Sequence, residues 1–241
     1  MRFMVMHKVD AKGEAGEPPS RQIIERMGEL IGESMKSKVC VDGAGLHRGA
    51  TRVRVKPRGD ASMTVRGPYP GENELVASMA MIKTKSMDEA TEVAARFGRA
   101  SGNVEIEVGP VVEAWDLGIM PKPKSEYERF LLLFKGDMKT ESGEAPSSEE
   151  RARLAALEDE LGRTGVLLKR VMLAPSSKAK RLASGPKNER RWTDGPFIES
   201  KELIGGFAVL ELPSIEDAIA WADRYVAILG DNEVDIRELA G

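Results

Sequence analysis

The chain has 241 residues, a formal net charge of −3 at pH 7, and 31% charged and 41% hydrophobic residues. This nearly balanced charge gives no overall attraction to nucleic acid or to an anionic membrane surface. The single cysteine, Cys40, excludes a disulfide framework, and no apolar run approaches the ~18 residues of a membrane helix. The apolar start is too short for a signal peptide, so we expect a cytoplasmic protein with no membrane partner.

The first elements are a strand, a loop and a helix. Residues 3–8 form a short apolar run, which is typical of a buried strand. Residues 11–19 are rich in Gly, Glu and Pro and are expected to form a loop. Ser20 can cap a helix in which apolar residues recur at i, i+3 or i+4, and i+7. The elements predicted after this helix are strands at 38–41 and 51–55, a Gly-Pro turn at 67–68, a strand at 75–82, a helix that Ser86 caps, and a strand at 103–108.

The second half of the chain repeats this pattern at an offset of about 128 residues. The matched segments are 2–10 with 129–137, 67–69 with 195–197, 74–76 with 202–204 and 86–90 with 214–218. A capping-box pattern at 147–150 and a capping Ser214 begin the two helices of this half. We therefore predict two tandem units, residues 1–116 and 127–241, joined by a linker at 117–126.

Each predicted unit has the order β-α-β-β-α-β with an extra hairpin, which is the ferredoxin-like α+β arrangement. Such a sheet carries helices on one face only, so its other face must be buried. We expect the two sheets to pack face to face within one chain, as an intramolecular dimeric α+β barrel that is a monomer or a weak homodimer.

A motif near the end of the chain resembles a known family. Residues 192–197 read Trp-Thr-Asp-Gly-Pro-Phe and are followed by Lys201-Glu202 and Gly205-Gly206-Phe207. This stretch resembles the DGPF subgroup of the YCII-related domain family. The likeness covers about residues 127–241, and the first half resembles the family more weakly.

The resemblance implies a dimeric α+β barrel with a cavity between its sheets. Some relatives carry a histidine and an aspartate proposed as an acid/base pair, and a few act on small chlorinated aromatic acids. The family's histidine would stand near the start of the first helix of each unit. Residues 18–21 and 146–149 contain no histidine there.

Two residues are the candidates for catalysis. Asp194 could act as a general base if a cavity raised its pKa, or it could simply close the turn before Gly195. His7 should share a strand face with Phe3 and Val5, either as a cavity-lining acid/base or as a core histidine with a satisfied hydrogen bond. Two histidines without clustered carboxylates predict no metal site. The sequence contains no phosphate-binding glycine motif, so no cofactor is predicted.

The central region of each half is basic although the whole chain is slightly acidic. Arg52 and Arg181, which we match to each other, could bind a carboxylate or phosphate. Arg66 belongs to the same basic region, and Trp192, Phe197 and Tyr69 could form an aromatic cavity wall. The alternative is a solvated basic hairpin. The lack of aromatic residues between the charges argues against nucleic acid.

These observations favour a protein that binds a small anionic molecule, aromatic acids included, through a cavity between its sheets, with enzyme activity left open. The alternative is a non-catalytic protein-interaction or regulatory module.

Overall fold

The computed structural model describes residues 1–59, 61–69, 74–185, 189–197, 203–230 and 232–240. The motif residues Lys201 and Glu202 lie outside these ranges. The strands are β1 Arg2–Lys8, β2 Cys40–Leu46, β3 Val53–Arg58, β4 Ala61–Arg66, β5 Val76–Thr84, β6 Ile106–Val112, β7 Glu128–Lys135, β8 Leu167–Met172, β9 Lys180–Gly185, β10 Glu189–Asp194, β11 Ile204–Glu211 and β12 Val234–Glu238. The α-helices are α1 Ala11–Ala15, α2 Arg21–Lys36, α3 Met87–Ala100, α4 Met138–Ser142, α5 Ser148–Arg163 and α6 Ile215–Leu229. None of the described helices is long and apolar enough to span a membrane.

Serine caps begin the four long helices, as the sequence predicted. The hydroxyl oxygens of Ser20, Ser86 and Ser214 accept hydrogen bonds from backbone N–H groups in the first turn. Ser147 and Glu150 form a reciprocal capping box at the start of α5. Each cap satisfies donors that have no partner within the helix, so local sequence is sufficient to fix these helix starts.

The expected loop after the first strand is in part helical, which corrects the prediction. Asp10 caps the short helix α1 by accepting a 2.6 Å hydrogen bond from the Gly13 N–H. Asp137 caps α4 in the same way, by accepting a hydrogen bond from the Thr140 N–H. Helices of one turn carry too few apolar residues to show a periodic pattern, so composition alone predicts a loop.

All of the described strand pairs are antiparallel. The strands form two six-stranded sections of one large sheet, and the fold is of the α+β class. Sheet A has the order β10-β9-β12-β1-β11-β2, and sheet B has the order β4-β3-β6-β7-β5-β8. Two residue pairs between β2 and β6 join the sections, Gly45 with Val112 and Leu46 with Val111. The element order from β1 to β6 recurs from β7 to β12.

The two sheets do not coincide with the two halves of the sequence. Sheet A takes β1 and β2 from the first half and β9 to β12 from the second half. Sheet B takes β3 to β6 from the first half and β7 and β8 from the second half. The predicted boundary at 117–126 therefore divides the sequence but not the sheets, because β1 pairs with β11 and β12, and β7 with β5 and β6.

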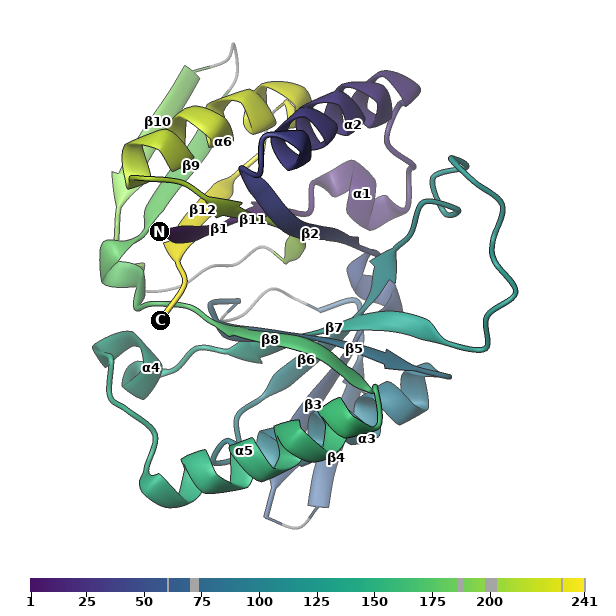
Figure 1. Cartoon of the computed structure of the whole chain (residues 1–241), viewed down its shortest axis with the longest axis vertical. Coiled ribbons are helices and arrows are strands. Elements are labelled where there is room, and N and C mark those ends of the chain that lie inside the picture. Colours follow the sequence, from purple (N-terminus) through teal and green to yellow (C-terminus); the bar gives the residue numbers. More distant parts are fainter. Residues whose placement is uncertain (60, 70–73, 186–188, 198–202, 231, 241) are drawn as a thin grey trace.

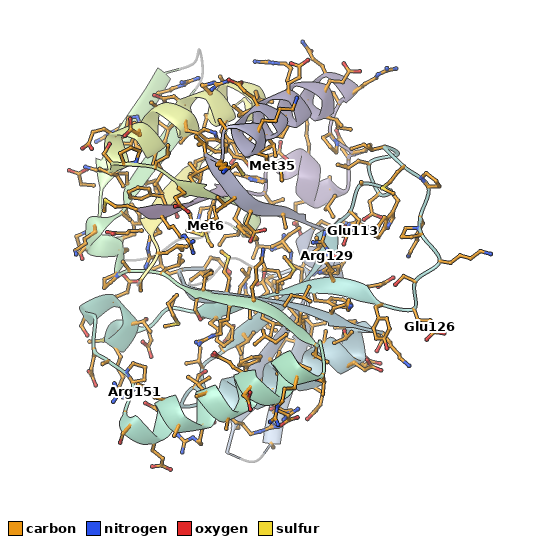
Figure 2. The ribbon with its side chains drawn as sticks, in the orientation of Figure 1. Met6, Met35, Glu113, Glu126, Arg129 and Arg151 are labelled. Carbon is orange, nitrogen blue, oxygen red and sulfur yellow. The ribbon has the colours of Figure 1, made fainter. Side chains whose placement is uncertain are left out.

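The molecule has four layers, with α2 and α6 outside sheet A and α3 and α5 outside sheet B (Figure 1). One apolar core lies between each sheet and its helices. A third core fills the space between the sheets, where Figure 2 shows the side chains that include Met6. In the described part of the chain, Met4, Met79, Leu131 and Phe207 occupy space between the two sheets, where the sequence predicted a cavity.

Candidate functional site

A cluster of four buried charged residues lies on sheet B, on the side that faces sheet A. We call Arg54, Glu74, Glu107 and Lys135 the sheet B cluster. Arg54 donates from Nε to Glu107 at 3.0 Å and from Nη2 to Glu74. Lys135 donates to Glu74 and lies 3.4 Å from Glu107. Each carboxylate therefore contacts both cations of the cluster, which offsets the cost of burying the charges.

The charge state of Glu107 follows from its partners. Burial alone would raise its pKa, but Lys135, Arg52 and Arg54 lower that pKa from 4.5 to about 2. Arg52 reaches Glu107 with a 3.0 Å hydrogen bond from Nη1. Glu107 is therefore ionised near neutral pH and pairs with three cations on the side of sheet B that faces sheet A.

A similar group, which we call the sheet A cluster, contains Lys8, Arg181 and Asp235. The Lys8 amine lies 3.0 Å from Asp235, and Arg181 donates two hydrogen bonds to the same carboxylate at 2.6 and 2.9 Å. Burial would raise the pKa of Asp235, but Lys8 and Arg181 outweigh burial and lower it. Arg181 is thus committed to an internal carboxylate and is not an open anion anchor.

The Gly-Pro-aromatic turns pack against these arginines. The Arg54 guanidinium lies 3.9 Å from the centre of the Tyr69 ring, and that of Arg181 lies 4.1 Å from the centre of the Phe197 ring. A Cβ atom on Gly195 would lie 1.7 Å from the Ser176 carbonyl oxygen, so only glycine fits there. The motif thus holds an aromatic ring on an arginine that is paired with a buried acid.

Strand register corrects the expected match of Arg52 with Arg181. Arg54 pairs with Glu107 across β3 and β6, and Arg181 pairs with Asp235 across β9 and β12. Arg54 is therefore the counterpart of Arg181. Arg52 is fully buried, and its Nε donates to the His47 carbonyl at 2.7 Å.

The other expected site residues are dispersed. Asp194 ends β10 with 77% of its side chain exposed, and it accepts a 2.6 Å hydrogen bond from Lys180. Arg66 ends β4 and is also exposed, 3.7 Å from Asp88. Trp192 packs on the core between sheet A and its helices, on the other face of the sheet from the sheet A cluster. The structure therefore does not bring Asp194, Arg66 and Trp192 together.

His7 lies on the strand face predicted for it, with Phe3 and Val5 against the helices. Its Nδ1 is 2.7 Å from the Tyr225 hydroxyl. Burial, followed by the nearby charge of Arg52, lowers the pKa of His7 from 6.5 to about 4. Cβ atoms on Gly205 and Gly206 would lie within 2.7 Å of the ring, so the two glycines make room for the imidazole. His7 thus lies beside Tyr225, on the face of sheet A that is turned away from sheet B.

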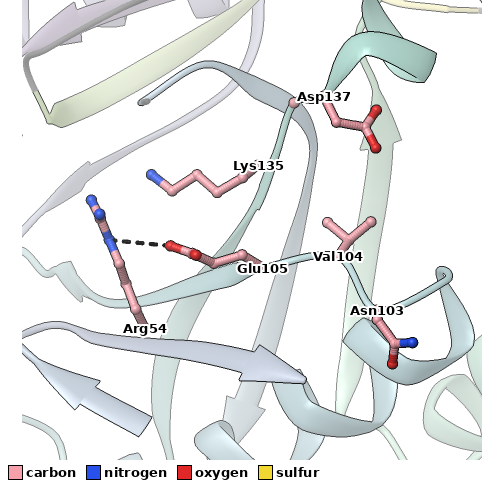
Figure 3. A pocket seen from close by; sticks show the side chains of 7 residues that line it. Arg54, Asn103, Val104, Glu105, Lys135 and Asp137 are labelled. Carbon is pink, nitrogen blue, oxygen red and sulfur yellow. Dashed lines mark ion pairs between the residues drawn. The ribbon is translucent and has the colours of Figure 1, made fainter. Parts of the chain in front are cut away.

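A cavity of about 290 Å³ borders the sheet B cluster. We call it the charged cavity, and Figure 3 shows the residues that line it, Arg54, Asn103, Val104, Glu105, Lys135, Gly136 and Asp137. Glu105 lies 3.8 Å from Arg54 and 3.1 Å from Lys56. The lining contains two cations, Arg54 and Lys135, and two carboxylates, Glu105 and Asp137, so the cavity presents both signs of charge to a ligand.

A second cavity of about 240 Å³ lies between sheet B and the start of α5, and we call it the α5 cavity. It shares Val104, Lys135 and Asp137 with the charged cavity, so the two adjoin. Apolar side chains line one part of it, those of Phe134, Leu154 and Met172. Polar side chains line the rest, among them Ser101, Lys139 and Arg170.

Two of these polar groups are buried without a hydrogen-bond partner. They are the Ser101 hydroxyl and Nε of Arg170, and neither atom has a partner among the residues that the structure describes. A buried donor left unpaired costs about 1–3 kcal/mol, so such groups call for an explanation.

Sequence reasoning missed Glu107, Lys135, Ser101 and Arg170. One signal was present, because Lys8 and Lys135 end matching apolar strands, and Glu107 and Asp235 stand between apolar residues in others. A charged residue within a buried strand needs an internal partner. In contrast, Ser101 and Arg170 carry no local signal, because only packing shows which hydroxyl or guanidinium lacks a partner. Among the residues with described placement, no three His, Cys, Asp or Glu side chains form a group that could hold a metal ion.

Comparison with known proteins supports part of the expected family resemblance. The model of the YCII-related domain family matches residues 129–238. No curated protein and no solved structure matches the chain. The matched residues run from β7 to β12 and so contribute strands to both sheets. Residues 129–238 are thus similar to a YCII-related domain, and their strands are divided between the two sheets.

Proposed function

We propose that the chain is a tandem pair of DGPF-type YCII-related units that together form an intramolecular α+β barrel. The repeated element order supports this proposal, as does the ring of Tyr69 or Phe197 on an arginine in each half. We also propose a cytoplasmic monomer or weak dimer. A single cysteine and the internal pairing of the two sheets support that assignment.

Within this frame, the protein binds a small anionic molecule in the cleft formed by the charged cavity and the α5 cavity. The observation that carries this function is the pair of buried, unpartnered donors, Ser101 and Arg170, at the wall of the α5 cavity. The combined volume, roughly 500 Å³, falls within the usual range for small-molecule sites. This cleft lies at the strand ends of sheet B rather than in the middle of the inter-sheet layer.

No catalytic step is assigned to Asp194 or His7. Asp194 is largely exposed and pairs with Lys180, and it lines neither the charged cavity nor the α5 cavity. His7 is held by Tyr225 on the far side of sheet A from the inter-sheet layer. The proposal is therefore for binding, and any turnover would have to use groups of the cleft.

Val104 offers a test, because it lines both cavities. A thermal-shift screen of acids, amines and neutral polar compounds should yield ligands for the natural protein, and Val104→Phe should remove those shifts by filling the cleft. Val41→Phe makes the same change at an exposed position on β2 and should keep them. Ligands that shift both variants equally would place binding elsewhere and contradict the proposal.

A non-catalytic interaction module is the second candidate. The filled inter-sheet layer favours it, as does the absence of histidine from residues 18–21 and 146–149. In that case a single stoichiometric protein partner would bind Val104→Phe as tightly as the natural protein, and the compound screen would yield no ligand.

A further inference from the structure

We infer that the α5 cavity binds a monocarboxylate with one ring or a comparably compact apolar body. This inference rests on the proposed binding function and names the class of ligand. It follows from three properties of the cavity: two residues of its lining carry buried, unpaired donors, part of its wall is apolar, and three acids line it.

The donors are held in place by the surrounding structure. Arg170 donates from Nη1 to Glu158 at 2.7 Å, and its guanidinium lies 5.1 Å from the centre of the Phe134 ring. These two contacts fix the guanidinium and leave Nε without a partner in the described structure. Ser101 follows α3, and its hydroxyl is also unpaired. A carboxylate has two oxygens that can accept from both groups, and a hydrogen bond between charged partners is stronger than a neutral one.

The remaining wall suits an apolar body. Phe134 and Leu154 belong to the core between sheet B and its helices, and Met172 of β8 lies beside them in the cavity. A dry cavity of about 150 Å³ is known to hold benzene in another protein. The α5 cavity, at about 240 Å³, therefore has room for one ring and its carboxylate.

The acids that line the cavity favour a ligand with a single negative charge. Asp137, Glu144 and Glu150 also line the cavity. Asp137 and Glu150 also accept hydrogen bonds from backbone N–H groups at helix caps. A second carboxylate on the ligand would lie among three acids and, besides Arg170, two lysines, of which Lys135 is already paired with Glu74 and Glu107, and like charges at short range repel.

The chain offers this site in sheet B but not at the corresponding place in sheet A. Arg170 of β8 pairs with Ala80 of β5, whereas at the matching position Gly43 of β2 pairs with Ala208 of β11. Glycine supplies no donor side chain. The inference therefore includes a stoichiometry of one ligand per chain.

Calorimetric titration of the full chain with sodium benzoate, benzamide and phthalate tests the class. Benzoate should bind at one site per chain, and benzamide and phthalate should bind at least tenfold more weakly. Arg170→Lys keeps the positive charge but removes Nε, and Ser101→Ala removes the hydroxyl without breaking a contact of the fold. Each should raise the benzoate Kd by about tenfold or more, as expected for losing a hydrogen bond to a charged group.

Arg163→Lys is the matched control, because Arg163 is an exposed arginine of α5 that pairs with Asp159 outside the cavity. Its benzoate Kd should not change. Equal binding of benzamide and benzoate, or unchanged benzoate binding in both Arg170→Lys and Ser101→Ala, would overturn the ligand class. If Val104→Phe still abolished benzamide binding, the cleft would keep its function. If none of the three probes nor any compound of the wider screen bound, the proposed function would fall together with the class.

Discussion

His7 and Phe134 occupy corresponding places near the ends of β1 and β7, yet their surroundings differ. His7 contacts the Tyr225 hydroxyl, whereas Phe134 meets Phe97 with ring centres 5.6 Å apart. Across the sheet, Gly206 faces His7 and Ser78 faces Phe134. Corresponding positions thus hold the polar pair His7–Tyr225 in sheet A and the apolar pair Phe134–Phe97 in sheet B. We expect the polar pair to lower the stability of the protein at low pH.

Stability should fall in acid because of His7. Its pKa is about 4 in the folded protein and near 6.5 when unfolded, so the effect is absent above pH 6.5. As the pH falls from 6.5 toward 4, the unfolded chain gains a proton that the folded chain does not, which costs at most about 1.4 kcal/mol per pH unit. Urea unfolding at pH 5 and pH 7.5 should show a smaller pH difference for His7→Phe combined with Tyr225→Phe than for the natural protein.

His47→Gln serves as the comparison, because His47 lies in a loop, 3.2 Å from Asp116, with part of its side chain exposed. That variant should keep the pH difference of the natural protein. A double variant that loses as much stability at pH 5 as the natural protein does would show that His7 is not the group responsible.

Removing the charge of Glu107 should destabilise the fold strongly. Glu107→Gln leaves Arg52, Arg54 and Lys135 with one carboxylate fewer in a buried setting, and breaking a buried ion pair costs about 3–5 kcal/mol. Glu105→Gln removes a partly exposed carboxylate and should cost less than about 1 kcal/mol. Denaturant unfolding measures both, and equal effects would contradict a structural role for the sheet B cluster.

Residue types in the sequence indicated where the conspicuous motif lies but not what it does. The Asp194-Gly195-Pro196-Phe197 stretch predicted a site, and the structure shows an exposed aspartate beside a ring packed on Arg181. Gly195 and Phe197 serve packing between segments: Gly195 lies close to the Ser176 carbonyl oxygen, and Phe197 packs on Arg181. Those contacts depend on register, which residue types alone do not specify.

At the scale of elements, α4 is attached to the rest of the molecule chiefly through polar contacts. None of its residues is buried. Glu141 accepts a 2.9 Å hydrogen bond from the Ser176 N–H and lies 3.3 Å from Arg237 of β12. Lys139 and Thr140 of the same helix line the α5 cavity. The helix therefore links the wall of that cavity to sheet A.

Glu141→Ala should loosen α4 without unfolding the protein. Backbone amides of residues 138–142 should exchange hydrogen about tenfold faster or more, because loss of a hydrogen bond to a charged group lowers the local opening energy. Hydrogen exchange read by mass spectrometry resolves this segment. Glu14→Ala is the matched control in α1, where Glu14 accepts a 2.8 Å hydrogen bond from the Gly49 N–H. It should speed exchange near residues 11–15 and leave 138–142 unchanged; uniform acceleration over the whole chain would instead indicate global destabilisation.

Local signals predicted elements better than they predicted connections. The four capped helices begin where Ser20, Ser86, Ser147 and Ser214 indicate, since a cap involves neighbours only a few residues away. The partners of β1 could not be predicted, because β1 can pair with strands from either half without changing which of its faces is apolar. Both arrangements bury the same side chains, so the apolar pattern does not distinguish them.

For the whole molecule, the exchange of strands between halves has a direct experimental consequence. Residues 1–116 expressed alone lack β11 and β12, the two hydrogen-bonded neighbours of β1. Residues 127–241 alone lack β5 and β6, the neighbours of β7. Each half should be largely unfolded or aggregated, and mixing the two should give a 1:1 complex with the circular dichroism spectrum of the natural chain.

Light scattering and size-exclusion chromatography decide this prediction. The full chain should elute as a monomer or a weak dimer. If the two halves fold separately and do not associate, this result would contradict the strand exchange and would favour independent units.

The pairing of the first strand with the last also sets an order of events during synthesis. β1 and β12 are adjacent, and both termini lie on the same side of the molecule (Figure 1). The ribosome must therefore add about 200 residues before the first partner of β1 exists, which takes about 10–40 s at typical elongation rates. In contrast, sheet B has all of its strands once Met172 has emerged. In the nascent chain, the apolar residues 2–8 therefore have no pairing strand while sheet B is completed. We expect a chaperone to bind this stretch in preference to others.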